Sequence, residues 1–313
     1  ICSQLGFSDD SAILVVFASE AMEITSGCGG DVASDGRAAG REAASACLRD
    51  LTRHKDKARF AVLLADPLSA GISGVDAGVK DVLGETFPVV GGVSAAHSKQ
   101  RTTHQFFHDE VRTNSVVLLL FAGDMQFSVG IKGGHSALGA RRTVTHAEKN
   151  VVYRIGDMTA YDYFRHHIGE YDLFMNYCLA IYPDGGDAFY VLSAPYSDAD
   201  SGSVSLNGPL PLQAEVQLGT ADKSNINLSC RESITTALNN FRGTKICTAL
   251  FFSCAGRKMI MGTRIHEEYD IAKQLLPDTP FAGFYCYGEF APLLPETAFH
   301  FHGTTFVTLL IGY

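Results

Sequence analysis

The residues best suited to chemistry follow the apolar run 246–254, in "FFSCAGR" (251–257). Small residues at the carboxyl end of a strand let a ligand approach the backbone, and that edge of an open α/β sheet is where ligands bind. Arg257 supplies a planar fork of donors that suits a carboxylate or a phosphate. Ser253 and Cys254 would lie beside such a ligand. The alternative is a simple strand-to-helix turn with Arg257 facing solvent.

Two residues are candidates for a nucleophile, Cys254 and Ser94. A catalytic thiol needs a neighbouring base and a lowered pKa, and no spacing in the sequence identifies that base. Ser94 lies in "GGVSAA" (91–96), where a nucleophile elbow would require Gly in place of Ala96. An inert, packed thiol and a turn or pocket serine are the simpler interpretations, so we predict that the chain is not an enzyme.

Histidines offer a second kind of chemistry, metal ligation. His300 and His302 are two apart in "FHFHG" and would share one face of a strand. That spacing suits a metal, or one axial ligand to haem iron. "IHEEYD" (265–270) lacks the second His of a zinc-binding H-E-x-x-H helix, so Glu268 is expected to turn inward on an amphipathic helix. Chance pairs are common among 11 histidines, which favours a structural role for each of them.

Composition and charge argue against two classes of partner. The 313 residues carry a formal net charge of −9, which opposes binding to the phosphate backbone of DNA or RNA. The longest apolar runs, 116–122 and 306–311, are far shorter than the roughly 20 residues that span a bilayer. The cysteines form no C-x-x-C motif, which indicates reduced thiols. We therefore expect a cytoplasmic protein that does not insert into membranes.

Apolar runs alternate with helical patterns, which is typical of an α/β sheet covered on both faces. In the first half we expect strand 10–19, helix 37–52, strand 59–66, helix 75–83, strand 87–92 and strand 113–123. In the second half we expect strand 187–194, helix 231–241, strand 246–254, helix 264–276, strand 281–287 and strand 304–311. The region between them is expected to hold a loop at 130–142, a helix at 161–173 and a polar loop at 196–208.

The two halves repeat one order of elements. Segment 40–66 parallels 230–254, and "ETFPVVGGVSAA" (85–96) parallels "DTPFAGFYCYGE" (278–289). We interpret this as an internal duplication of one α/β unit, with mixed or parallel sheets flanked by helices, although any α/β protein contains some such echoes. Two copies argue against a solenoid. The domains are predicted at 10–200 and 205–313.

The segment "PFAGFYCYGEFAP" (280–292) has the composition of either a core strand or the wall of a ligand site. Its parallel in the first half, and its place after "FFSCAGR", favour the second interpretation. Few polar groups among aromatic ones are typical of a small-molecule pocket. We expect residues 280–284 to pack in the core, and Tyr285, Gly288 and Glu289 to contact the ligand.

These motifs together resemble the FIST family. The order "FFSCAGR", "IHEEYD", "PFAGFYCYGEFAP" and "FHFHGTTFVTLL" is similar to the C-terminal module of that family. "PVVGGVSAA" and "RRTVTHAEKNVVYRIGDMTAYDYFRHHIG" resemble its N-terminal module, so the likeness covers nearly the whole chain. The departures are Gly92 where the family has Cys, Gly303 where it has Asn, and Lys149 where it has Gly.

The resemblance implies a sensory, ligand-binding module of bacterial-type signal transduction. Family members are proposed to bind small molecules such as amino acids, and are often fused to kinase, cyclase or chemoreceptor output domains. Some stand-alone members are described as haem proteins that sense nitric oxide and regulate a partner enzyme. A chain of 313 residues leaves no room for an output domain, which favours a separate histidine kinase or diguanylate cyclase partner.

Three hypotheses follow for the site. The first places an amino acid-like ligand in a pocket made mainly by the C-terminal half, lined by Ser253, Cys254, Arg257, Glu268, Tyr285, Gly288, Glu289 and His302, with Ser94. The second has the same fold binding haem as a nitric oxide sensor, through His302 or, as second choice, His266. The third is an enzyme with Cys254 or Ser94 as its nucleophile, and it has the least support.

Overall fold

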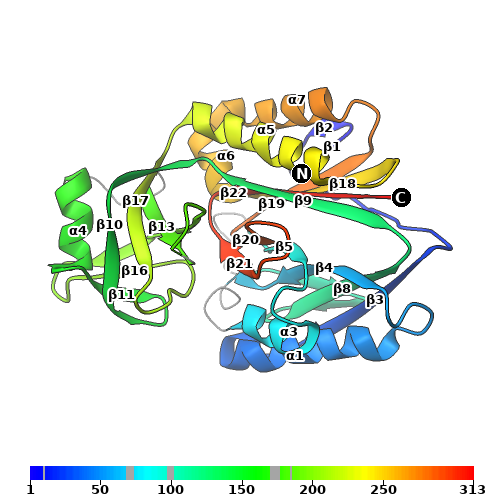
Figure 1. Ribbon diagram of the computed structural model, residues 1–313, viewed down its shortest axis with the longest axis horizontal. Helices are drawn as coiled ribbons and strands as arrows, with labels where there is room; N and C mark the ends of the chain where they lie inside the picture. Colours follow the sequence, from blue (N-terminus) through cyan, green and yellow to red (C-terminus); the bar gives the residue numbers. More distant parts are fainter. Residues whose placement is uncertain (10, 68–73, 97–101, 170–176, 184) are drawn as a thin grey trace.

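The computed structural model describes residues 1–9, 11–67, 74–96, 102–169, 177–183 and 185–313. Two six-stranded sheets lie at its centre, and helices cover the outer face of each, so this part of the molecule has four layers (Figure 1). A third sheet stands to one side of them. The α/β fold class predicted from the sequence is confirmed.

The first sheet has the strand order β21-β20-β5-β4-β8-β3. Strands β4 and β5 are parallel, whereas β8 is antiparallel to both β4 and β3. Two helices bury small side chains, mostly Ala and Val, against its outer face. The bounds are β3 (Met22–Gly29), α1 (Val32–Asp50), β4 (Ala58–Ala65), α3 (Val75–Leu83), β5 (Val89–Val93), β8 (Val116–Gly123), β20 (Glu289–Pro292) and β21 (Phe299–His302), with a separate hairpin of β6 (Gln105–Phe107) and β7 (Glu110–Arg112).

The second sheet has the strand order β2-β1-β19-β18-β22-β9. Strands β18 and β19 are parallel, whereas β22 is antiparallel to both β18 and β9. Helices α5 and α7 cover its outer face. The bounds are β1 (Cys2–Ser3), β2 (Gly6–Phe7), β9 (Gln126–Gly133), α5 (Lys223–Asn240), β18 (Ile246–Cys254), α6 (Ala255–Met261), the 3-10 helix η1 (Gly262–Ile265), α7 (His266–Leu275), β19 (Phe281–Cys286) and β22 (Thr305–Gly312).

The two sheets repeat one topology. The orders β5-β4-β8-β3 and β19-β18-β22-β9 have the same pattern of parallel and antiparallel pairs. In both copies the amide of an alanine donates to a proline carbonyl at 2.9 Å, Ala61 to Pro88 and Ala249 to Pro280. This equivalence supports the duplication of one α/β unit that the sequence suggested.

A third, antiparallel sheet is inserted between β9 and α5. Its strand order is β14-β13-β17-β10-β11-β16-β15, with β12 paired to β11. The predicted domain bounds, 10–200 and 205–313, divide this sheet between β15 and β16. Its elements are β10 (His135–Glu148), β11 (Val151–Ile155), β12 (Met158–Thr159), α4 (Ala160–Ile168), β13 (Tyr177–Tyr182), β14 (Tyr190–Ser193), β15 (Tyr196–Asp198), β16 (Ser203–Ser205) and β17 (Glu215–Ala221).

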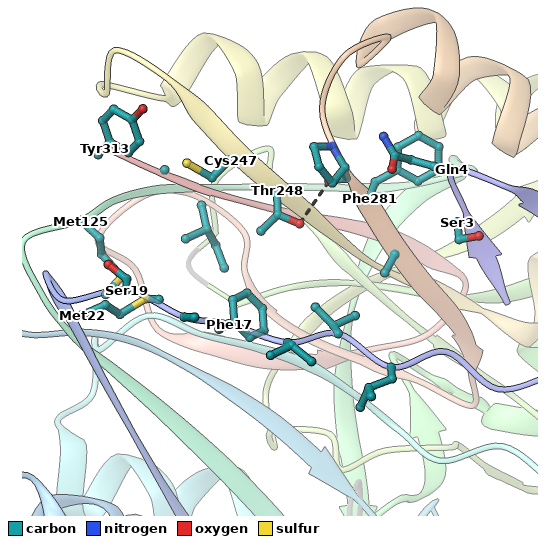
Figure 2. Close-up of a pocket in the computed structure, with 18 of the residues that line it drawn as sticks. Ser3, Gln4, Phe17, Ser19, Met22, Met125, Cys247, Thr248, Phe281 and Tyr313 are labelled. Carbon is teal, nitrogen blue, oxygen red and sulfur yellow. Dashed lines mark hydrogen bonds between the residues drawn. The ribbon is translucent and has the colours of Figure 1, made fainter.

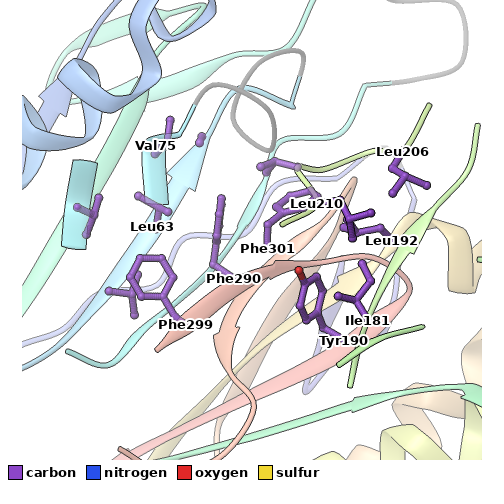
Figure 3. Close-up of a cluster of buried hydrophobic side chains, with 14 of the residues drawn as sticks. Leu63, Val75, Ile181, Tyr190, Leu192, Leu206, Leu210, Phe290, Phe299 and Phe301 are labelled. Carbon is purple, nitrogen blue, oxygen red and sulfur yellow. The ribbon is translucent and has the colours of Figure 1, made fainter. Parts of the chain in front are cut away.

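Hairpin β20–β21 joins the first sheet to the third. Its phenylalanines Phe290, Phe299 and Phe301 lie between Leu63 of β4 on one side and Tyr190 of β14 on the other (Figure 3). The rings of Phe290 and Phe301 meet edge to face, with centroids 5.4 Å apart. The hairpin contacts the third sheet through this apolar cluster and through the stacking of His300 on Tyr190 of β14, with ring centroids 5.2 Å apart.

Two loop predictions are wrong. Segment 130–142 consists of the end of β9 and the start of β10. Its glycines allow helix α5 to approach, because a Cβ on Gly130 would lie 2.0 Å from the Ser233 carbonyl oxygen and one on Gly134 would lie 2.5 Å from Ile226 Cδ1. Segment 196–208 contains the paired strands β15 and β16, so its polar residues lie on a hairpin.

The strand predicted at 10–19 is also wrong. Residue Asp10 lies outside the described residues, and 11–19 form no strand. The segment is apolar enough to form a strand. It lies across a cavity from Met22 and Cys247, however, and it pairs with no strand of either central sheet. A strand needs a backbone partner as well as an apolar composition. The sequence pattern shows the apolar composition but not whether a partner strand is present.

The two central sheets share one core. It contains Phe60 and Phe121 from the first sheet, and Phe252, Val307 and Leu309 from the second. The rings of Phe60 and Phe121 stack with centroids 4.6 Å apart, and both side chains are fully buried. Burial of this seam holds the two copies of the unit together.

Truncation of Phe121 tests this seam. The variant Phe121→Ala should lose about 3–5 kcal/mol of unfolding free energy, because a buried ring is removed and leaves a cavity. Phe106→Ala is the matched control, since Phe106 is 74% exposed and its loss should change stability by less than about 0.5 kcal/mol. Urea unfolding measures both, and equal losses would contradict the described core.

Candidate functional site

The ends of β18 and β19 bring several of the predicted residues together. Ser253 and Tyr285 are neighbours across these parallel strands. Helix α6 begins directly after β18 and carries Arg257, and α7 carries Glu268. The carboxyl edge of the second sheet therefore holds two hydroxyls and two opposite charges, at the edge where open α/β sheets bind ligands.

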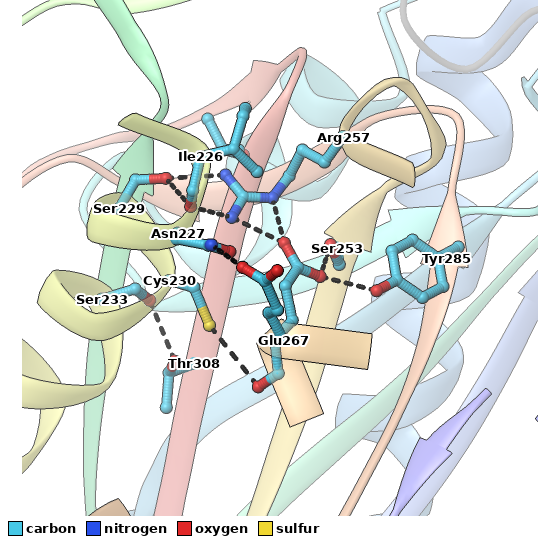
Figure 4. A network of polar contacts seen from close by, with 12 residues as sticks. Ile226, Asn227, Ser229, Cys230, Ser233, Ser253, Arg257, Glu267, Tyr285 and Thr308 are labelled. Atoms are coloured by element: carbon cyan, nitrogen blue, oxygen red, sulfur yellow. Dashed lines mark hydrogen bonds and ion pairs between the residues drawn. The ribbon is translucent and has the colours of Figure 1, made fainter. Parts of the chain in front are cut away.

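The Arg257 cluster, defined as Ser229, Ser253, Arg257, Glu268 and Tyr285, is a closed hydrogen-bond network (Figure 4). Arg257 Nε donates to Glu268 Oε1 at 2.9 Å, and Nη2 lies 2.7 Å from the same oxygen. Arg257 Nη1 donates to Ser229 Oγ at 2.8 Å. The hydroxyls of Ser253 and Tyr285 donate to Glu268 Oε2 at 3.1 and 2.6 Å.

Burial sets the electrostatics of the cluster. The side chains of Arg257 and Glu268 are 0% and 2% exposed. Burial opposes the charged form of Arg257, but the Glu268 carboxylate outweighs it and raises the pKa of the guanidinium. Burial and then the charge of Glu268 raise the pKa of Tyr285 well above its usual range, so its hydroxyl stays protonated and donates.

Among its described residues, the first copy has no arginine–carboxylate pair at the equivalent strand ends, and a network of uncharged side chains around Asp66 lies there instead. Ala65 and Val93, paired across β4 and β5, stand where Ser253 and Tyr285 are paired across β18 and β19. Neither can donate to a carboxylate. The duplicated units have therefore diverged at the strand ends, and the charged network belongs to the C-terminal half.

Glu289 and His302 lie apart from the Arg257 cluster. They face each other across β20 and β21. Glu289 Oε2 accepts hydrogen bonds from the Thr305 amide at 3.1 Å and the Thr305 hydroxyl at 2.7 Å, and Oε1 accepts one from Cys286 Sγ at 3.2 Å. Burial outweighs these bonds and raises the pKa of Glu289 to about 7. This carboxyl therefore changes charge near neutral pH.

Two glycines at this edge, Gly288 and Gly92, are required by packing. A Cβ on Gly288 would lie 2.1 Å from the Phe301 ring. At Gly92, where the similar family motif has Cys, a Cβ would lie 2.8 Å from Cys286 Sγ. Gly303, where the motif has Asn, has less severe crowding. Close packing thus explains Gly288 and Gly92 without a ligand.

The two histidines proposed as haem ligands lie in unsuitable places. His302 is fully buried, its Nε2 is 2.8 Å from the Ala291 carbonyl oxygen, and its Nδ1 has no hydrogen-bond partner among the described residues. Burial lowers its pKa to about 3, so the ring is neutral. His266 is exposed at the start of α7, with Nδ1 3.0 Å from the Thr263 carbonyl oxygen.

Neither position fits a haem. Neither His302 nor His266 lines any of four cavities of about 860, 680, 540 and 10 Å³ in the described part of the chain. Across the described ranges, no group of three or more His, Cys, Asp or Glu side chains could hold a metal ion. It is His300 that lines a cavity, of about 680 Å³, between the third sheet and the segment that joins β20 to β21.

Within the described ranges, neither candidate nucleophile contacts a base that could activate it. Burial and the nearby charge of Glu289 raise the pKa of the Cys254 thiol, which therefore stays protonated. Ser94 Oγ accepts a hydrogen bond from Gln105 Nε2 at 3.0 Å and donates to the His104 carbonyl at 3.5 Å. An amide and a carbonyl cannot act as the base that a nucleophilic serine needs.

Two hollows adjoin the Arg257 cluster. A cavity of about 10 Å³, lined in part by Ser253, Glu268 and Tyr285, has room for about one water molecule. A polar groove of about 540 Å³ lies between α5 and α7, and we call it the α5–α7 groove. It is lined by Asn227, Leu228, Arg231, Glu267, Asp270, Ile271 and Gln274.

Sequence analysis missed this groove. Asn227 and Arg231 are four residues apart on α5, and Glu267 and Asp270 are three apart on α7, so each pair shares one helix face. The predicted helix 231–241 began too late, because α5 starts after Asp222, whose side chain accepts a hydrogen bond from the Asn225 amide. A search for capping residues upstream of 231 would have placed Asn227 on the helix.

Comparison with known proteins gives a family for both parts of the chain. The FIST N domain matches residues 1–158, and the FIST C domain matches residues 160–292. Uncharacterized proteins Mb0898c of Mycobacterium bovis and MT0897 of Mycobacterium tuberculosis are each 25% identical to this chain over 227 residues, which cover 68% of it. The matched region covers 58% of each relative, so the chain spans little more than half their length.

Removal of one partner tests the buried ion pair. Arg257→Met should lose about 3–5 kcal/mol of unfolding free energy, because it leaves the Glu268 carboxylate buried without its counter-charge. Adding Glu268→Gln should recover part of that loss, since the uncompensated charge is then gone. Urea unfolding of the single and double variants measures the difference. Equal stability of the two would contradict a charged, coupled pair.

The pKa of Glu289 predicts a pH dependence. The folded chain raises this pKa from 4.5 to about 7, so the folded state binds the proton more tightly than the unfolded state. Stability should therefore fall as pH rises between those two values, by up to about 3 kcal/mol from this group. Glu289→Gln should flatten the fall. Urea midpoints measured across that window would contradict the assignment if wild type and variant changed in parallel.

Proposed function

The chain belongs to the FIST family, and we propose that it is a sensory protein that binds a small amino acid-like ligand in its C-terminal half. FIST domains are associated with small-ligand sensing in signal transduction, and their families are sensory rather than catalytic. The observation that carries the proposal is the polar α5–α7 groove, which the buried Arg257–Glu268 pair meets through a hydrogen bond from Arg257 to the Ile226 carbonyl, next to Asn227.

The groove offers groups for both charges of an amino acid. Arg231 would receive the ligand carboxylate, and its Nη2 now donates to the neutral amide oxygen of Gln274 at 2.8 Å. Glu267 and Asp270 would receive the ammonium group. Hydrogen bonding to Arg264 lowers the pKa of Glu267 to about 2, so its carboxylate is charged at neutral pH.

An unpartnered acceptor also supports a ligand here. Asn227 Nδ2 donates to the Glu267 carboxylate, but Asn227 Oδ1 is buried and has no hydrogen-bond partner among the described residues. Buried polar groups are normally satisfied. A ligand ammonium placed between Asn227 and Glu267 would satisfy it.

The groove is coupled to the cluster through the backbone of both helices. The Ile226 carbonyl, next to Asn227 on α5, accepts a hydrogen bond from Arg257 Nη2 at 2.8 Å. Glu268 follows Glu267 on α7. A ligand that contacts α5 and α7 together favours the state in which these helices lie close, because only that state offers both sets of groups. Ligand binding would then be signalled by a change in the position of α7 relative to α5.

We propose that a separate protein of the histidine kinase or diguanylate cyclase type reads this signal, since FIST modules are associated with such output domains. The eight cysteines are free thiols, which supports a reducing, cytoplasmic setting for the pair. In the part of the chain that the structure describes, no helix is long and apolar enough to cross a membrane.

A thermal-shift screen with the common amino acids tests ligand and site together. At least one amino acid should raise the melting temperature in a saturable way, because a ligand that binds only the folded state stabilises it by about 2.7 kcal/mol at 100 times its Kd. Arg231→Ala should remove the shift. Arg242→Ala should keep it, because this exposed arginine lies beyond the end of α5 and outside the groove.

Two results would count against the proposal. A panel that gives no shift with wild-type protein contradicts an amino acid ligand. A shift that survives Arg231→Ala at the same ligand concentration contradicts the α5–α7 groove as its site.

A further inference from the structure

A further cavity lies at the other end of the second sheet from the Arg257 cluster. Its volume is about 860 Å³, and it lies between segment 11–19 and the amino ends of β18 and β19 (Figure 2). It shares no lining residue with the α5–α7 groove or with the 10 Å³ cavity. The proposed amino acid sensing does not use it.

The lining of this cavity is apolar. Its inner wall contains the side chains of Met22, Met125, Phe281 and Ile311. Methionine side chains are flexible and adapt to the shape of an apolar ligand. The one charged group among the described lining residues is Asp124, and this carboxylate is paired with Lys57 Nζ at 2.7 Å. The cavity therefore offers no cation to a ligand carboxylate or phosphate.

Its outer wall is segment 11–19, which we call the strap. Exposure alternates along it: Ile13 and Val15 are 40% and 37% exposed, whereas Leu14 and Val16 are 86% and 77% exposed. Alternate side chains of an extended segment point to opposite sides. All four side chains line the cavity, and Ile13 and Val15 are the two that are turned more toward the protein.

The strap is held by side chains and not by a sheet. Phe17 is its anchor, half-buried with its ring edge-on to Phe121 at a centroid distance of 5.4 Å. Residues 12–18 have no backbone hydrogen bond with the described part of the chain. A wall without ladder hydrogen bonds can open locally at a small free-energy cost.

We propose that this cavity binds a neutral, apolar small molecule, with the strap as its movable outer wall. A volume of about 860 Å³ lies within the range of about 300–1,000 Å³ that small-molecule pockets have. Apolar cavities take up apolar ligands in preference to water. The absence of a free cation in the described lining selects against fatty acids and other anions, so the ligand class is uncharged.

Fluorescence titration of the full chain with N-phenyl-1-naphthylamine, a neutral apolar probe, tests the proposal. Wild-type protein should bind it saturably at one site. The double variant Ile13→Ser/Val15→Ser, on the inward face, should weaken binding by at least about tenfold, since buried apolar area is lost. Leu14→Ser/Val16→Ser changes the more exposed lining residues of the same strap, and it should weaken binding less than the Ile13/Val15 variant does.

A variant on the opposite wall of the cavity tests binding without altering the conformation of the strap. Cys247, on β18, lines the cavity and is exposed. Cys247→Trp should narrow the cavity and weaken probe binding without any change to the strap. Lack of saturable binding by wild type would overturn the proposal. So would equal loss in both strap variants, or loss confined to Leu14→Ser/Val16→Ser, which would indicate self-association through the more exposed side chains.

Discussion

The buried Arg257–Glu268 ion pair is the interaction on which the C-terminal site depends. A charged side chain is stable in a protein interior only when it is paired and hydrogen-bonded. Here one carboxylate oxygen binds the guanidinium and the other binds two hydroxyls, from β18 and β19. Four elements are thereby fixed to one another, namely α6, α7 and the two strand ends. Arg257 also binds Ser229 and the Ile226 carbonyl of α5, so the pair ties together the two helices that border the α5–α7 groove.

The duplication explains how such a site can exist without weakening the fold. Two copies of one α/β unit bury a common apolar seam between their sheets, and that seam needs no polar residue. The strand ends are then free to diverge. Ala65 and Val93 stand in the first copy where the second copy has Ser253 and Tyr285, whose hydroxyls bind the Glu268 carboxylate. One copy therefore supports the structure and the other carries the candidate site.

Sequence patterns predicted the elements that local apolar periodicity determines. They missed the features that depend on contacts between distant parts of the chain. Helix 75–83 and strand 246–254 have the predicted bounds, because their apolar periodicity is complete. Gly130 was interpreted as a loop residue, but it provides room for α5. The resemblance to a family singled out Arg257, Glu268, Ser253 and Tyr285, which the structure brings together. No spacing in the sequence could show that β20 and β21 join the first sheet and carry Glu289 and His302 away from the Arg257 cluster.

Hydrogen exchange on α5 and α7, with and without a stabilising amino acid, tests the central claim most directly. If the ligand bridges the groove, backbone amides of residues 223–240 and 266–275 should exchange more slowly at saturation, because binding suppresses the opening of both helices together. The two sheets should change less. Slowing confined to other segments, or no slowing at a ligand concentration that raises the melting temperature, would contradict a ligand site between α5 and α7.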